Sequence, residues 1–124
     1  MVTRRSLVGL VALVLVVSGA AQGWREHQAR QLGRELAQLA RPGDITMMSS
    51  TTCVFCKRAR QFMTARQVPF TECFIETDAR CAQRYEALGA RGTPTLLVRG
   101  QLQLGFSAPA VRDQLRALPA RPGA

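Results

Sequence analysis

The stretch ITMMSSTTCVFC, residues 45–56, decides the fold of this chain. Residues 45–50 form a short, largely apolar run that ends in Ser and Thr, the pattern of a buried strand that leads into a helix. The Ser/Thr cluster at residues 49–52 can cap that helix, which we expect over residues 53–66. A Cys-x-x-Cys pair, Cys53 and Cys56, therefore falls in the first turn of a helix directly after a strand.

This position gives the two cysteines different chemistry. Residues three apart lie on the same side of a helix, close enough for a disulfide bond. The free amide groups and the macrodipole at the helix N-terminus stabilise a thiolate on Cys53, and Lys57 and Arg58 add positive charge one turn further on. Cys56 lies deeper in the helix, so we predict that Cys53 is the nucleophile and Cys56 the resolving thiol.

The rest of the chain alternates between strand and helix patterns. The apolar residues of the first helix predict an inward face made of Phe55, Cys56, Ala59, Phe62 and Met63. Further elements are expected as strands at 70–77, 94–98 and 101–106 and as helices at 78–88 and 109–118. Thr77 or Asp78 is expected to cap the first of these two helices. The resulting order is strand, helix, strand, helix, strand, strand, helix, which indicates an α/β domain.

A second motif, Thr93-Pro94, opens the third strand. With both motifs in place, residues 44–118 resemble the glutaredoxin branch of the thioredoxin superfamily. The resemblance implies a thioredoxin-like fold, β-α-β-α-β-β-α around a central four-stranded mixed sheet, and a cis Thr93–Pro94 bond against the cysteine pair. It also implies a thiol–disulfide oxidoreductase, with the Thr93 backbone free to pair with the substrate. The residues expected to contact the substrate lie within the two motifs or next to them: Thr52, Val54, Phe55, Thr93 and Pro94.

The resemblance is less specific about the substrate, for which we expect disulfides of proteins or of small thiol compounds. Many family members carry Cys-Pro-Tyr-Cys, whereas this chain has Val54 and Phe55 between its cysteines. The basic residue and the Gly-Gly-acid pattern that bind glutathione in glutaredoxins are replaced by Ser50-Thr51 and by residues 105–107, Gly-Phe-Ser. Glutathione therefore stays a candidate co-substrate, and we expect a monomer with no bound cofactor.

Cys73 and Cys81 form a second pair, in the expected second strand and the helix that follows it. They are candidates for a structural disulfide, and two separate buried thiols are the alternative. Structural zinc sites place their paired ligands two to four residues apart, whereas Cys73 and Cys81 are eight positions apart. We therefore expect no metal site. Two alternative functions stay open: a thiol module that binds copper, zinc or an iron–sulfur cluster, and a non-catalytic interaction module tethered to a membrane.

The N-terminus combines two positive charges, Arg4 and Arg5, with an uncharged stretch over residues 6–24. That stretch is long enough to cross a bilayer as a helix, so residues 1–24 are expected to be a signal anchor or a cleaved signal peptide. Residues 25–43 are expected to be an amphipathic helix and linker, and residues 119–124 a tail. Four cysteines fit an oxidising compartment. We therefore expect a bacterial inner-membrane protein with its domain in the periplasm, or a soluble periplasmic protein if the signal is removed.

The net charge of +9 does not indicate a nucleic-acid partner. Residues 1–43 contribute six basic and two acidic side chains, and residues 44–124 contribute eleven and six. No basic run or interleaved aromatic residues would form a stacking platform. We therefore expect no binding to nucleic acid.

Overall fold

The computed structural model describes residues 2–120 and divides into two compact units between Gln31 and Leu32. A single helix, α1 (Arg4–Leu39, 36 residues), replaces the two N-terminal helices that we expected, because no proline interrupts residues 4–39. Its apolar part is long enough to cross a membrane, and a signal sequence would meet the same criterion. Of the expected tail at 119–124, residues 121–124 lie outside the described residues.

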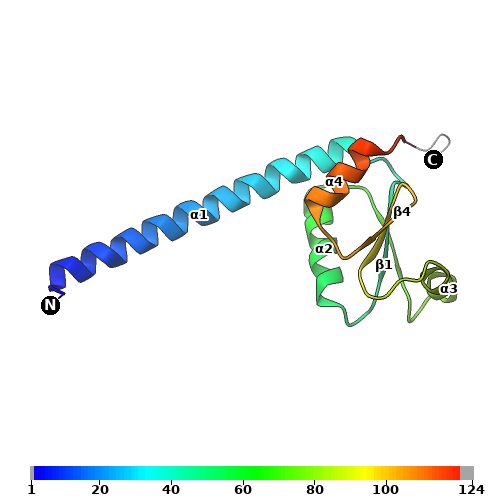
Figure 1. Cartoon of the computed structure of the whole chain (residues 1–124), viewed down its shortest axis with the longest axis horizontal. Helices are drawn as coiled ribbons and strands as arrows, with labels where there is room; N and C mark the ends of the chain where they lie inside the picture. Colours follow the sequence, from blue (N-terminus) through cyan, green and yellow to red (C-terminus); the bar gives the residue numbers. More distant parts are fainter. Residues whose placement is uncertain (1, 121–124) are drawn as a thin grey trace. The chain divides into compact units, whose positions relative to one another are not determined.

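A four-stranded mixed sheet forms the centre of the second unit, as expected (Figure 1). Its strand order is β2-β1-β3-β4, with β1 parallel to β2 and antiparallel to β3, and with β3 antiparallel to β4. A helix connects the parallel pair, whereas Arg99 and Gly100, both with positive φ, make the tight turn of the β3–β4 hairpin. The strands are β1 (Ile45–Ser49), β2 (Thr71–Phe74), β3 (Thr95–Val98) and β4 (Gln101–Leu104).

Three further helices cover the sheet, with α2 and α4 on one side and α3 on the other (Figure 1). The strands β2 and β4 are shorter than the expected 70–77 and 101–106, because a turn follows Phe74 and Gly105 adopts a positive φ after β4. Asp78 caps α3, one of the two caps that we expected. The helices are α2 (Val54–Ala65), α3 (Ala79–Ala87) and α4 (Ala108–Ala117).

Apolar side chains fill both faces of the sheet. Met47 and Met48 are fully buried on opposite faces, as the period of a strand requires. The larger cluster also contains Leu36 from the end of α1, so the compact unit includes the last turns of α1 as well as the domain expected from residue 44. The smaller cluster, on the α3 side, centres on Met48, Cys81 and Leu97.

A buried ion pair, Asp44 with Arg99, joins the ends of two helices to the sheet. The guanidinium Nη2 donates to Asp44 Oδ2 at 3.0 Å, and the N–H of Arg41 donates to the same oxygen at 2.8 Å. Burial would raise the pKa of Asp44, but the hydrogen bonds from Arg99 and Arg41 and the charge of Arg99 lower it below its ordinary value. The guanidinium also donates to carbonyl oxygens at the ends of α1 and α4, on Leu39, Leu115 and Leu118.

Candidate active site

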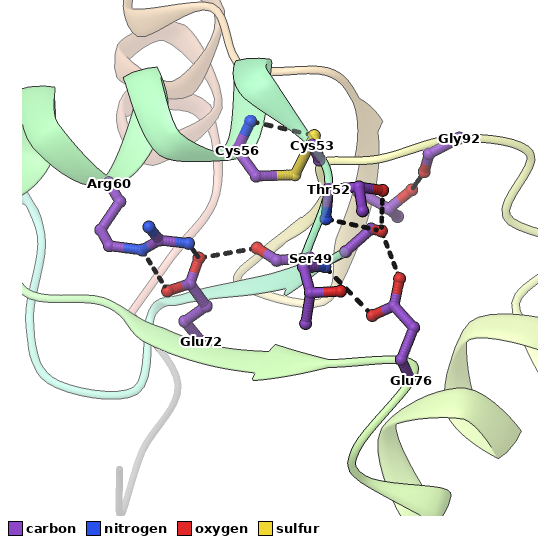
Figure 2. Close-up of a disulfide and its surroundings, with 11 residues drawn as sticks. Ser49, Thr52, Cys53, Cys56, Arg60, Glu72, Glu76 and Gly92 are labelled. Carbon is purple, nitrogen blue, oxygen red and sulfur yellow. Dashed lines mark hydrogen bonds and ion pairs between the residues drawn. A yellow bond between two sulfur atoms is a disulfide. The ribbon is translucent and has the colours of Figure 1, made fainter.

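Cys53 and Cys56 form a disulfide at the start of α2, with their Cα atoms 5.2 Å apart (Figure 2). Cys53 is itself the N-cap residue, and its sulfur accepts the N–H of Cys56 at 3.0 Å. The expectation that the Ser/Thr cluster would cap this helix was therefore wrong, because the extended backbone that precedes α2 reaches as far as Cys53. The cap places the sulfur of Cys53 over the free amide groups of the first helical turn.

The two cysteines differ in exposure. Cys53 is partly exposed, whereas Cys56 is fully buried in the first turn of α2. A disulfide partner in solution can therefore approach Cys53 but not Cys56.

The prediction that Phe55 faces the core was wrong. Phe55 is 66% exposed and its neighbour Val54 is 60% exposed, because these first two helical residues point away from the sheet. Cys56, Ala59 and Met63 make the buried face of α2 instead. The Arg58 guanidinium lies 5.9 Å from the centre of the Phe55 ring, so an aromatic and a cationic side chain stand together beside the disulfide.

A groove of about 620 Å³ runs between α2, the Thr93–Pro94 loop and the turn after β4. The Thr93–Pro94 bond is cis, and the Pro94 carbonyl accepts the N–H of Gly105 at 2.7 Å, which joins two walls of the groove. The groove is mainly apolar, and Arg58 is the charged residue that lines it. Its other lining residues are Phe55, Ala59, Phe62, Gly92, Thr93, Pro94, Leu104, Gly105 and Phe106.

The structure divides the expected substrate contacts between two depressions. Phe55, Thr93 and Pro94 line the apolar groove, whereas Thr52 and Val54 line a smaller hollow of about 190 Å³ that also includes Cys53. Val54 and Phe55 are neighbours in the first turn of α2, so this turn contributes to both hollows.

Two glutamates that sequence reasoning missed hold the strand and the loop before Cys53 (Figure 2). Arg60 pairs with both carboxylate oxygens of Glu72, at 2.6 and 3.0 Å, and Ser49 Oγ donates to the same carboxylate at 2.7 Å. The hydrogen bond to Glu72 raises the pKa of Arg60 above its ordinary value. Glu76 accepts hydrogen bonds from Ser50 Oγ and from the N–H of Thr51, at 3.2 Å for the latter.

The hydrogen bond from Ser50, with a smaller contribution from Thr51, lowers the pKa of Glu76 below its ordinary value. Glu76 was expected to lie within the second strand, but β2 ends at Phe74 and leaves Glu76 on the following turn. In the sequence, Glu76 is one of a series of aromatic and acidic residues at every second position from residue 70 to residue 76. This alternation predicts a strand, but it does not predict that Glu76 contacts the loop before Cys53.

A second disulfide joins Cys73 in β2 to Cys81 in α3, with 6.0 Å between their Cα atoms. Asp78 Oδ1 caps α3 by accepting the N–H groups of Arg80 and Cys81, at 3.0 and 3.2 Å. Among residues 2–120, no group of three or more His, Cys, Asp or Glu side chains is placed to hold a metal ion.

Comparison with known proteins agrees with the fold described above. The glutaredoxin family model matches residues 45–103. The crystal structure of a variant of the thioredoxin-like protein BC3987 shares 21% identity, with 60% of this chain and 96% of that chain covered and a TM-score of 0.54. The glutaredoxin from Methanosarcina mazei Go1 shares 21% identity over 59% of this chain and 78% of that one, with a TM-score of 0.50. At these identities the likeness shows the fold. No curated protein is similar enough in sequence to be counted as a relative.

Proposed function

Residues 45–103 of this chain form a glutaredoxin domain, and from this premise we propose that the chain is a thiol–disulfide oxidoreductase with Cys53 as nucleophile and Cys56 as resolving thiol. The observation that carries the proposal is the first turn of α2, where the sulfur of the partly exposed Cys53 accepts an amide N–H and lies over the helix N-terminus. A negative charge on Cys53 is stabilised there by the hydrogen bond and by the helix dipole. Such stabilisation favours both attack by Cys53 and its departure as a leaving group.

The reaction runs as two exchanges. The Cys53 thiolate attacks one sulfur of a substrate disulfide, which forms a mixed disulfide and releases the other sulfur as a thiolate that takes up a proton. Cys56 then loses its proton and attacks the Cys53 sulfur, which forms the Cys53–Cys56 disulfide and releases the second substrate thiol. Two electrons pass from the cysteine pair to the substrate. The same steps in reverse oxidise a client dithiol.

The apolar groove supports a protein as the main substrate. Its aromatic and aliphatic lining suits an apolar side chain next to the reacting cysteine of a client. We propose that Thr93 offers its backbone to that client, while Pro94 and Phe55 contact its side chains and Thr52 and Val54 contact it from the smaller hollow. Glutathione is a candidate co-substrate, because the glutaredoxin family uses it as a substrate.

Substitution of single cysteines tests the chemistry. Cys53→Ser should abolish the reduction of insulin and of glutathione mixed disulfides. Cys56→Ala keeps the attacking thiol and is the matched control: it should accumulate mixed disulfides that mass spectrometry detects. Full activity of Cys53→Ser would overturn the proposal. Stoichiometric metal on the reduced, purified protein would favour a metal-binding thiol module, and redox-inactive protein with an intact fold would favour an interaction module.

We also propose that α1 directs the domain to the periplasm of a bacterium, either as a retained inner-membrane anchor or as a cleaved signal. The apolar part of the helix supports a membrane role, and two disulfides support an oxidising compartment. The mass of the mature protein distinguishes the two forms. Labelling of cysteines by a membrane-impermeant reagent after outer-membrane permeabilisation should modify the reduced protein, and labelling that requires lysis would contradict the periplasmic location.

A further inference from the structure

The turn between β2 and α3 carries a carboxylate that reaches the loop in front of Cys53. Glu76 accepts hydrogen bonds from Ser50 Oγ and from the N–H of Thr51. The carbonyl oxygen of Ser50 in turn accepts the N–H of Cys53 at 3.2 Å. Figure 2 shows the carboxylate of Glu76 directed at this loop, with Thr52 and Cys53 beyond it. Glu76 therefore holds the residues that immediately precede the reactive sulfur.

The disulfide between Cys73 and Cys81 restricts this turn. The bond closes a loop of chain whose ends lie in β2 and α3, and Glu76 lies inside that loop. Cys81 is the buried residue of α3 and packs against the Met48 face of the sheet. Because α3 buries so little else, the disulfide is a principal tie between this helix and the sheet. Breaking it would let the turn and its carboxylate move away from the loop.

From this arrangement we propose that Glu76 is a positioning residue for Cys53 and that the Cys73–Cys81 disulfide keeps it in place. The proposal rests on the proposed role of Cys53 as the attacking thiol. The effect of Glu76 on Cys53 differs between the oxidised and the reduced state of the Cys53–Cys56 pair. In the oxidised state the Cys53–Cys56 bond holds the Cys53 sulfur against α2, and reduction removes this bond, so the sulfur of reduced Cys53 is held less tightly. The hydrogen bonds of Glu76 therefore contribute more to the reduced state.

The charge of Glu76 acts in the opposite direction, because a carboxylate near Cys53 disfavours a thiolate there. Glu76 is exposed, so at physiological ionic strength, where the Debye length is about 8 Å, much of this repulsion is screened. The loss of two hydrogen bonds to the loop is expected to dominate. Removal of Glu76 should therefore weaken the reduced state and slow attack by Cys53.

The test uses the full chain in detergent and the variant Glu76→Ala, with Glu86→Ala as the matched control, since Glu86 is an exposed carboxylate of α3 outside the turn. Two quantities are measured: the rate at which iodoacetamide alkylates reduced Cys53, and the equilibrium of the Cys53–Cys56 pair with dithiothreitol. Mass spectrometry of separate peptides follows each cysteine pair by itself. Glu76→Ala should slow alkylation and shift the equilibrium toward the disulfide, each by about three- to tenfold, while Glu86→Ala should change neither.

The double variant Cys73→Ser/Cys81→Ser tests the second half of the proposal. It should produce shifts of the same direction and similar size, and adding Glu76→Ala to it should have little further effect, because both changes release the same contact. If the shifts from Glu76→Ala and from the double variant were fully additive, the disulfide would not act through Glu76, and the second half of the proposal would be overturned. If Glu76→Ala had the alkylation rate and the dithiothreitol equilibrium of the wild type, that result alone would overturn the proposal, even if the double variant failed to fold. Neither measurement requires turnover, so an inactive protein with these shifts would contradict the proposed function and leave the positioning role standing.

Discussion

Removal of Arg99 should be among the most damaging single substitutions in the domain. Its guanidinium pairs with the buried Asp44 and donates to backbone carbonyls at the ends of α1 and α4. The side chains of Arg99 and Asp44 are only 8% and 3% exposed, so neither water nor salt compensates for the loss. Removal of one partner from a buried pair costs about 3–5 kcal/mol, since it leaves an unpaired charge. We expect a cost of this size for Arg99→Ala.

Thermal unfolding followed by circular dichroism checks this value. For a domain of this size, about 1 kcal/mol shifts Tm by roughly 4–8 °C, so Arg99→Ala should lower Tm by at least about 12 °C. Arg91→Ala, which removes an exposed arginine from the loop before β3, is the matched control and should leave Tm nearly unchanged. Equal Tm values for the two variants would refute this role of Arg99.

The pH dependence of stability provides an independent check on the same pair. The pKa of Asp44 is lower in the folded protein than in the unfolded chain, so its ionised form stabilises the fold. That contribution is fully present above the ordinary Asp pKa of about 3.9 and is lost as pH falls through the lower folded pKa. The difference in unfolding free energy between wild type and Asp44→Asn should therefore be largest near neutral pH and shrink below about pH 4. A difference in unfolding free energy that stayed the same at every pH would contradict this role of the Asp44 carboxylate.

Two further substitutions test packing and cross-linking. Cys73→Ser/Cys81→Ser should lower the free energy of unfolding by about 2–3 kcal/mol, because the disulfide closes a short loop in the unfolded chain. Denaturant titration measures this free energy, and an unchanged value would contradict the prediction. Gly33→Ala should destabilise the domain by about 1–3 kcal/mol, since a Cβ there would lie 2.1 Å from Cδ of Arg66. Gly23→Ala meets open space and should not destabilise α1, so equal Tm values for the two alanine variants would argue against the clash.

Much of the fold and the reactive pair could be predicted because their signals are local. The position of Cys53 and Cys56 after a strand, a helix cap at Thr77 or Asp78 and the order of elements all follow from spacings within a few residues. The cis bond at Pro94 came from the family resemblance, since nothing in the local sequence requires it.

The sequence by itself therefore determined the order of strands and helices after residue 44 and the two cysteines at the start of a helix, and the family resemblance supplied the fold. Only the tertiary structure decided that Phe55 faces solvent beside the groove, because its exposure depends on how α2 rotates against the sheet. It also decided the partners of Glu76 and Arg99, which lie 26 and 55 residues away in the chain at Ser50 and Asp44. Hydrophobic periodicity reports which side of an element is buried, whereas the partner of a polar side chain depends on which distant segments the fold brings together.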